Sequence, residues 1–248
     1  MSGVASRRAD LRQYRGSDAG WLAAHLSNAS AEAAIASVLQ DAAWGRVAVV
    51  SSFGAESAVL LDIVADVNRH VPVIFVNTLR LFPETLCYAQ DLTAHLGLSD
   101  VRWVEPDPAA LARADPRLLR WSYDPDGCCE VRKVEPLARA LQDFDTWISG
   151  RKRFQSGTRA GLAKVEADGE RLKVNPLADW DAGMLAGRAA ERRLPPHPLV
   201  AEGYPSIGCV PCTSKVQPGE DPRAGRWRGW DKTECGIHTA LPGSDPVF

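Results

Sequence analysis

The sequence predicts an α/β fold: a mostly parallel sheet with helices on both faces. Short β-branched runs alternate with segments of helical periodicity along most of the chain, as in strand-helix-strand units. The 248 residues are enough for one main domain with additions, and the composition is that of an ordinary globular protein. Ligands of such sheets bind at the carboxyl ends of the strands, so we expect the site there.

Residues 1–44 are predicted to form a helical segment ahead of this domain. Apolar residues recur at helical spacing over 21–43, and a polar break at 27–30 divides them into two helices. The α/β domain is expected over 45–200. It opens with a strand at 46–50, a loop of small residues at 51–57 and a helix through 59–67.

The strand-helix pattern then repeats with a strand at 71–76, a loop at 77–83, a helix at 84–96 and a strand at 101–104. A helix over 129–142 leads into a strand at 146–149, which ends in the basic run Gly150-Arg-Lys-Arg153. Residues 164–175 predict a hairpin with a primed turn at Asp168-Gly169, followed by a helix at 182–193.

The pattern ends at Pro195-Pro-His-Pro198, and the Gly- and Pro-rich remainder has little periodicity. We interpret 201–248 as a loop and a mobile C-terminal tail.

Composition excludes several classes of protein. A net charge of -2 gives no general attraction to nucleic acid or to anionic membranes. No apolar stretch reaches the roughly 18 residues of a membrane helix, and the charged start has no signal-peptide core, which predicts a cytoplasmic protein. Six cysteines in such a chain favour metal binding or thiol chemistry over disulfides.

Four cysteines form two close pairs, Cys128-Cys129 and Cys209-Val-Pro-Cys212. Two such pairs commonly close one metal site. Around a single zinc ion the sulfurs would lie roughly 3.8 Å apart, given Zn-S bonds of about 2.3 Å, whereas a cubane binds each thiolate at a separate iron. Adjacent cysteines whose side chains diverge favour the iron-sulfur cluster, and zinc stays the alternative.

Three neighbouring features bear on this prediction. Gly127 would let the backbone bend tightly around a cluster. Lys133, one helical turn after Cys129, would offset the charge of the thiolates. The isolated Cys87 falls on an apolar helix and is expected in the core.

The loop 51–57 lies between a strand and a helix. Its small and hydroxyl residues suit a nest of backbone N–H groups that binds phosphate or sulfate, although it lacks the Lys-Ser/Thr ending of a Walker A loop. An ordinary capped helix start is the alternative. Near the end, Cys235 has His238 three residues on and Arg223 and Arg226 before it. Cationic neighbours favour a reactive thiolate, and a spare exposed thiol is the alternative.

Taken together, the two cysteine pairs, the loop Ser51-Ser-Phe-Gly-Ala-Glu-Ser57 and the terminal Glu234-Cys-Gly-Ile-His238 resemble the assimilatory adenylyl-sulfate (APS) reductases over about residues 45 to 240. The resemblance implies an adenine-nucleotide α-hydrolase-like fold. It also implies reduction of APS to sulfite and AMP, in sulfate assimilation and cysteine biosynthesis, with thioredoxin as electron donor. Relatives that use the 3'-phosphorylated substrate (PAPS) generally lack the cluster cysteines.

The resemblance assigns roles residue by residue. It implies a [4Fe-4S] cluster on the four paired cysteines, with Lys133 as the lysine beside the cluster and Cys235 as the nucleophile. It also implies that His238, with Arg223 and Arg226, closes over the substrate from the tail. The substrate ligands that it implies are Ser51, Ser52, Phe53, Gly54, Glu56, Ser57, Arg151, Arg153, Arg223 and Arg226. The chain departs from the family at Asn77-Thr-Leu79, where many members have Asp-Thr-Gly.

Cys235 is expected to form an S-sulfocysteine that thioredoxin then reduces, the tail closing for the first step and opening for the second. Other readings stay open: a cluster-bearing PAPS reductase, an ATP-pyrophosphatase-like transferase and a zinc-stabilised nucleotide-binding module. The sequence also leaves open a homo-oligomer.

Overall fold

The computed structural model describes residues 13–238. Within this range six strands form one sheet in the order β3-β2-β1-β4-β6-β5. The pairs from β3 to β6 are parallel, and β5 is antiparallel to β6. The strands are β1 (Val47–Val50), β2 (Val73–Val76), β3 (Val101–Val104), β4 (Thr146–Ser149), β5 (Val165–Asp168) and β6 (Arg171–Val174). The predicted mostly parallel sheet is confirmed.

The strand order reverses next to β1, which pairs with β2 on one side and with β4 on the other. Val50 lies beside Ile74 of β2 and beside Ser149 of β4. The carboxyl ends of the central strands therefore open at one edge of the sheet, which is where α/β folds place their ligands.

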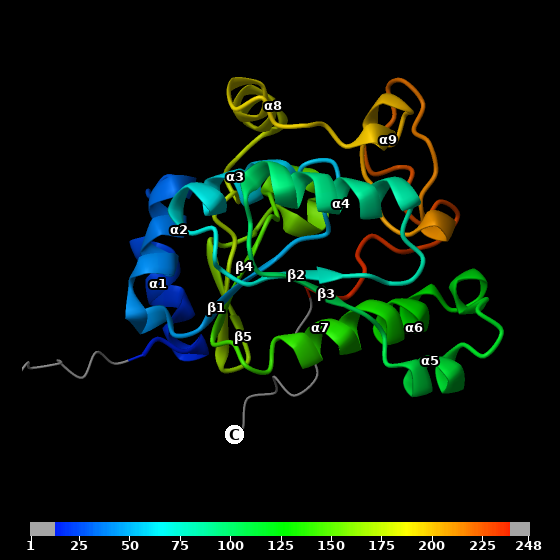
Figure 1. Ribbon diagram of the computed structural model, residues 1–248, viewed down its shortest axis with the longest axis horizontal. Coiled ribbons are helices and arrows are strands. Elements are labelled where there is room, and N and C mark those ends of the chain that lie inside the picture. The colour runs from blue at the N-terminus through cyan, green and yellow to red at the C-terminus, as the bar shows by residue number, and fades with distance from the viewer. Residues whose placement is uncertain (1–12, 239–248) are drawn as a thin grey trace, which may run out of the picture.

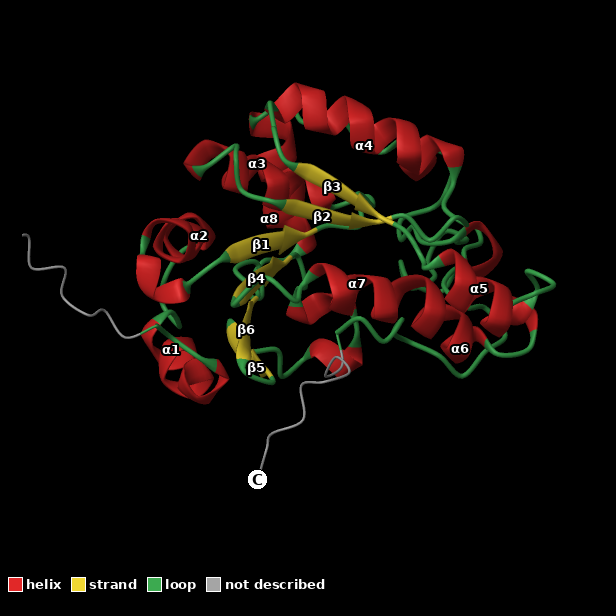
Figure 2. Ribbon diagram, turned by 60° about the horizontal axis from the view of Figure 1, so that its bottom comes forward, coloured by secondary structure: helices red, strands yellow, loops and turns green. Residues whose placement is uncertain are grey.

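Helices cover both faces of the sheet, as predicted (Figure 2). One face carries α3 (Ser57–Val67), α4 (Pro83–Leu96) and α8 (Ala182–Glu191). The other carries α5 (Pro108–Ala114), α6 (Pro125–Cys129) and α7 (Glu135–Ala140). Strand residues alternate between two cores because successive side chains point to opposite faces. Val49, Phe75 and Ile148 belong to the core of the first face, and Ala48, Ile74 and Trp147 to that of the second.

The N-terminal segment forms α1 (Ala19–His25) and α2 (Ala31–Gln40), with the predicted break between them. Ser30 caps α2, its hydroxyl accepting from the amide of Ala33 at 3.2 Å. Both helices pack into the core of the first face through buried Leu22, Ile35 and Val38.

The helix predicted over 129–142 is two helices joined by an irregular turn. α6 (Pro125–Cys129) starts earlier than expected because Asp124 caps it, accepting from the amide of Gly127, and Pro125 follows at its first position. A π-helical turn, Glu130–Val134, connects it to α7. The short helices α5 (Pro108–Ala114) and α9 (Pro198–Ala201) were not predicted, because helices of seven and four residues give little periodic signal.

The predicted hairpin is confirmed as β5 and β6, with Asp168 opposite Arg171 and Gly169 at a φ of +62°.

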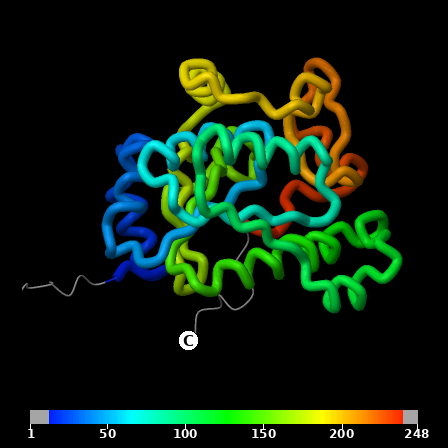
Figure 3. Tube along the Cα trace, in the orientation of Figure 1, coloured from blue at the N-terminus to red at the C-terminus, as the bar shows by residue number. Residues whose placement is uncertain are grey.

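The C-terminal segment, residues 195–238, crosses the sheet edge at which the central strands end (Figures 1 and 3). It contains α9 and one 3-10 turn, Val210–Cys212, and Cys209 forms an isolated antiparallel bridge with Leu81. No helix within residues 13–238 has the length and hydropathy of a membrane span. The first twelve residues and the last ten of the predicted tail lie outside the described residues.

Candidate active site

A cleft of about 300 Å³ lies at the carboxyl ends of β1, β2 and β4, with the C-terminal segment as its other wall. Most of the residues predicted for the site line it: Ser51, Ser52, Gly54, Glu56, Ser57, Lys133, Arg151, Arg223, Arg226, Cys235 and His238. The structure thus brings residues from distant parts of the sequence to the expected edge of the sheet.

The loop 51–57 forms one wall of the cleft. The amide of Phe53 donates to the Ser51 hydroxyl at 3.2 Å, and the amide of Ser57 donates to the Gly54 carbonyl at 3.0 Å. The amides of Ser52, Gly54 and Ala55 donate to no protein group among residues 13–238. Unused N–H groups ahead of a helix are the donors that an oxyanion requires.

The side chain of Phe53 does not face the cleft. Its backbone has a φ of +47°, which turns the fully buried side chain into the core, with its ring 4.9 Å from that of Phe75. Phe53 therefore anchors the loop by packing in the core, while the neighbouring residues Ser52 and Gly54 line the cleft.

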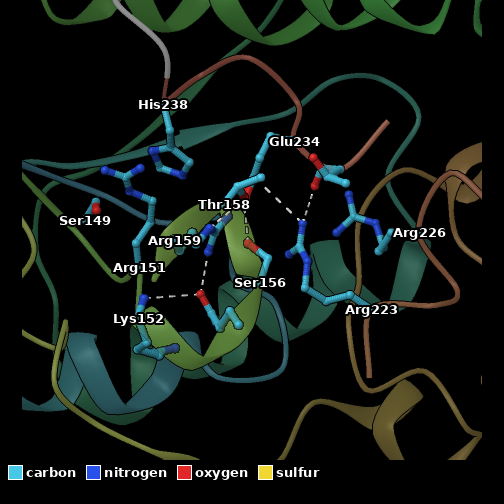
Figure 4. Close-up of polar contacts among 12 residues, drawn as sticks. Ser149, Arg151, Lys152, Ser156, Thr158, Arg159, Arg223, Arg226, Glu234 and His238 are labelled. Atoms are coloured by element: carbon cyan, nitrogen blue, oxygen red, sulfur yellow. Dashed lines mark hydrogen bonds and ion pairs between the residues drawn. The ribbon is translucent and has the colours of Figure 1, made fainter. Parts of the chain in front are cut away.

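Basic side chains form the floor of the cleft (Figure 4). Arg151 forms an ion pair with Glu166, and its buried Nε has no hydrogen-bond partner in the described part of the chain. Lys152, which the prediction missed, donates from Nζ to Glu56 Oε2 at 2.6 Å. Gln155 donates to the same oxygen at 2.6 Å, so Glu56 is the shared acceptor of two groups from the loop after β4.

Arg153, predicted as a substrate ligand, does not line the cleft. Its guanidinium bonds to the Leu162 carbonyl and to Asp179, outside the cleft. Arg159 lines the cleft instead and is buried. Nothing in the sequence pattern of 150–160 distinguishes the two arginines, because that stretch forms 3-10 turns and not a periodic element.

The C-terminal segment supplies the opposite wall. Arg159 holds the carboxylate of Glu234 through two hydrogen bonds of 2.7 Å, and Arg223 donates to the Thr233 carbonyl. Arg226 lies over the Trp227 ring at 4.4 Å, and its buried Nε has no hydrogen-bond partner among the described residues. This wall is cationic on the side facing the cleft.

His238 lies at the inner end of this wall. Its ring stacks on Trp147 at 6.0 Å, and Lys173 donates to its carbonyl. Burial, together with the positive charges of Arg151 and Arg159, holds the pKa of His238 well below its ordinary value. The imidazole is therefore neutral near pH 7.

The four paired cysteines gather beside the cleft. Cys128 and Cys129 end α6 and are buried, Cys209 is buried, and Cys212 ends the 3-10 turn half-buried. Burial raises the pKa of each thiol of the first pair, that of Cys129 to about 12, and the charge of Cys209 raises both further. The Cys209 sulfur also lies 3.2 Å from the Thr78 hydroxyl.

Lys133 connects this group with Cys235. Burial lowers the pKa of its ammonium, but the charges of nearby thiolates outweigh burial and raise that pKa. The thiolates are those of Cys209, Cys235 and Cys129. The π-helical turn thus places one cation between the cysteine pairs and the terminal thiol.

A buried ion pair joins the two sides of the cysteine group. Arg132 donates to Asp115 at 2.9 Å and to the Thr78 carbonyl at 3.0 Å, and both charged side chains are almost fully buried. The helix that carries the first cysteine pair is therefore tied to the loop that contacts Cys209.

Two predictions about single residues are wrong. Gly127 is helical, and its missing side chain makes room for the Arg120 guanidinium, whose nearest atom would lie 2.0 Å from a Cβ there. Cys87 is exposed because it lies on the side of α4 facing away from buried Thr85, Tyr88 and Ala89.

Known proteins resemble this chain closely. The family described as phosphoadenosine phosphosulfate reductase domain matches residues 46–215. An adenosine 5'-phosphosulfate reductase of Mesorhizobium japonicum is 53% identical over 78% of this chain and 76% of its own length. A phosphoadenosine 5'-phosphosulfate reductase of Gloeobacter violaceus is 42% identical over 78% of this chain and 82% of its own length.

The fold is shared with a solved structure as well. The phosphoadenylyl-sulfate reductase of Candida auris superposes with a TM-score of 0.65 at 24% identity, over 79% of this chain and 95% of that one.

Proposed function

The chain belongs to the phosphoadenosine phosphosulfate reductase family, and we propose that it reduces adenosine 5'-phosphosulfate to sulfite and AMP. The observation that carries this proposal is the position of Cys235, which lines a cleft with free loop amides on one wall and Arg223 and Arg226 on the other. A thiol suits the reaction because it is nucleophilic near neutral pH and forms an exchangeable bond to sulfur.

In the first step the Cys235 thiolate attacks the sulfur of the sulfate group. The bond from that sulfur to the bridging oxygen breaks, AMP leaves with the electron pair, and an S-sulfocysteine remains. The amides of the loop 51–57 would hold the phosphosulfate oxygens, and Arg151 and Arg226 would neutralise their charge. Lys133, which interacts electrostatically with Cys235, would place a positive charge beside the reacting group.

In the second step a thiolate of a thioredoxin-like dithiol attacks the Cys235 sulfur. Sulfite leaves with the electron pair of the S–S bond, and the second thiol of the donor resolves the mixed disulfide. The two electrons thus come from the dithiol. The terminal segment must open for this step, and we propose a cytoplasmic setting, where such donors are reduced.

We propose that Cys128, Cys129, Cys209 and Cys212 hold a [4Fe-4S] cluster. Three of these thiols are buried and that of Cys212 is half-buried, and Cys212 interacts electrostatically with Cys209 and Cys128, which fits a thiolate-bound centre. Within residues 13–238 no three His, Cys, Asp or Glu side chains are grouped to hold a single metal ion. When bound, the cluster would supply an electrostatic contribution to the cationic pocket.

The cofactor proposal is tested by metal analysis of the protein purified anaerobically. We expect about four iron and four sulfide per chain, as a cubane requires. Stoichiometric zinc with no labile sulfide would show that the alternative, a zinc site, is correct.

The reaction is tested by incubating the protein with APS and no thioredoxin and mapping the peptides by mass spectrometry. A sulfonate added to the peptide bearing Cys235, with AMP released, is expected. An adduct on Cys87, or none, would contradict the proposed nucleophile.

The second candidate substrate is PAPS, because a 42% identical relative is named for it. Sulfite release from each nucleotide under the same anaerobic conditions decides between them. Faster turnover of PAPS would replace APS in the proposal.

A further inference from the structure

Glu234, the residue before Cys235, forms a bidentate ion pair with Arg159. Arg159 donates from Nε to Glu234 Oε1 and from Nη2 to Oε2, both at 2.7 Å. The side chain of Arg159 is 9% exposed and that of Glu234 is 23% exposed. Two parallel bonds to a shielded carboxylate set its orientation as well as its distance.

Arg159 is itself oriented from the other side. Its Nη1 donates to Gln155 Oε1, and Gln155 donates to Glu56 Oε2 at 2.6 Å. Glu56 belongs to the loop 51–57 and also accepts from Lys152. A continuous chain of charged and polar groups therefore runs from the anion-binding loop to the residue beside the terminal thiol (Figure 4).

The segment around Cys235 is attached at separate points. Residues 229–238 contain no helix or strand, and their contacts with the domain include Lys232 with Asp126, Lys173 with the His238 carbonyl, the stacking of His238 on Trp147, and the packing of Ile237 on the core of the second face. Glu234 is adjacent to Cys235 in sequence, and Arg159 bonds to it twice at 2.7 Å, whereas Arg223 approaches it only to 3.7 Å. We therefore expect the Arg159 pair to have the larger effect on the position of the thiol.

We propose that Arg159 is a positioning residue that acts through Glu234 to seat Cys235 in the cleft. The role in catalysis rests on the proposed function, whereas the seating of the thiol does not. Losing either partner frees the segment, and the thiol then spends less time beside the loop 51–57.

The seating is tested by the rate at which iodoacetamide alkylates Cys235 in the intact chain, kept anaerobic and without substrate. Exposed Cys87 is the internal reference, and both rates are read by peptide mass spectrometry. Arg159→Gln and Glu234→Gln should each accelerate alkylation of Cys235 about tenfold, since charged hydrogen bonds hold the closed form. Arg159→Lys keeps the positive charge but cannot form two parallel hydrogen bonds with the carboxylate. Its alkylation rate at Cys235 should lie between those of these two variants and that of the unchanged protein.

The two substitutions separate seating from simple electrostatics. Arg159→Gln removes a positive charge and Glu234→Gln removes a negative one, so a purely electrostatic influence would change the alkylation rate in opposite directions in the two variants. Opposite effects of the two variants on alkylation, or no acceleration in either, would overturn the proposal. Arg153→Gln is the matched control, because that arginine pairs with Asp179 outside the cleft, and it should leave the rate unchanged.

A second measurement does not depend on thiol chemistry. Trypsin cleavage after Lys232, whose side chain is 6% exposed, requires the segment to leave the domain. Both variants should speed this cleavage about tenfold relative to Arg153→Gln, and equal rates in all three would overturn the proposal.

The catalytic consequence is measured as single-turnover formation of the Cys235 adduct. Both variants should slow it about tenfold at saturating APS, where binding is no longer limiting, and an unchanged rate would overturn the catalytic role. If the unchanged protein forms no adduct, the proposed reaction fails while alkylation and proteolysis still decide the seating.

Discussion

The sheet with its helices and the C-terminal segment 195–238 are held together by different forces. Val49, Ile74 and Ile148 are fully buried at the centre of the sheet, and two apolar cores cover its faces. The segment buries only single apolar side chains, among them Leu199, Ile207 and Trp227, and separate polar contacts attach it as well. These polar contacts include Tyr88 Oη to the Pro195 carbonyl at 2.8 Å, Thr85 with His197 at 3.0 Å, Lys232 with Asp126, and Arg159 with Glu234.

Because of this difference, the sheet accounts for most of the stability of the fold, and the segment carries the reactive thiol. Apolar burial is non-directional and accumulates over many side chains, whereas a single polar contact contributes about 1 kcal/mol and can be exchanged for water. The sheet can therefore stay folded while the segment, which carries Cys235 and half of the cysteine group, changes position.

Loss of the terminal thiol should have the largest effect on activity and almost none on stability. Cys235→Ser is expected to reduce sulfite release at least about a thousandfold, because a hydroxyl is a poor nucleophile for sulfur. Its free energy of unfolding should stay within about 0.5 kcal/mol of the unchanged protein. Cys87→Ser is the control, and substantial activity in Cys235→Ser would place the chemistry elsewhere.

A substitution in the sheet should have the converse effect. Phe75 is fully buried between Phe53 and Trp103, with ring centroids at 4.9 and 4.8 Å. Phe75→Ala should lower the free energy of unfolding in urea by about 3 to 5 kcal/mol. Phe154→Ala, at an exposed phenylalanine, should change it by less than about 0.5 kcal/mol. Similar losses of unfolding free energy for both variants would mean that burial in the sheet core is not what stabilises the sheet.

Lys133 tests the junction of the two regions, since the π-helical turn carries it toward Cys235. Lys133→Ala should slow formation of the Cys235 adduct about a hundredfold, the usual cost of one electrostatic contact to a reacting group. Lys133→Arg keeps the charge and should recover part of the rate. Retained iron and an unchanged rate in Lys133→Ala would make this residue an ordinary lysine.

The attachment of the segment to α4 should depend on pH through His197. This side chain is 1% exposed, accepts at Nδ1 from the amide of Leu199, and contacts Thr85 through Nε2. Burial lowers the pKa of His197 to about 4. Between about pH 6.5 and pH 4 the imidazole of His197 is protonated in the unfolded chain but neutral in the folded protein. The contribution of His197 to the free energy of unfolding is therefore complete above pH 6.5 and is lost as the pH falls toward 4.

The free energy of unfolding should consequently fall by about 2 kcal/mol between pH 7 and pH 5 from this residue. Urea titrations at the two pH values measure the difference. His197→Gln should remove that part of the slope, and exposed His70→Gln should keep it. An identical slope in the His197 variant would assign the pH dependence to other groups.

Local patterns predicted most of the sheet and half of the site. The strands at 71–76, 101–104 and 146–149 were identified within two residues, because alternation and β-branching are properties of neighbouring residues. The turn at Gly169 was identified for the same reason. The helix containing Cys129 was misplaced at its start and its π-helical turn was missed, since neither depends on hydrophobic periodicity alone.

The roles within the cleft were harder to predict. Phe53 was grouped with the loop by its place in the motif, yet one positive φ turns it into the core. Arg153 and Arg159 have the same chemistry and lie in the same irregular stretch, and only their packing separates a surface ion pair from a cleft residue.

The sequence by itself determined the order of strands and helices, the two cysteine pairs and the terminal thiol, because these depend on spacing within a few residues. Only the tertiary structure decided which charges meet. Glu234 lies 75 residues from Arg159, and Glu56 lies 96 residues from Lys152. Only folding brings such distant partners within hydrogen-bond distance. The polar contacts proposed to position the thiol could therefore not be predicted from patterns of neighbouring residues in the sequence.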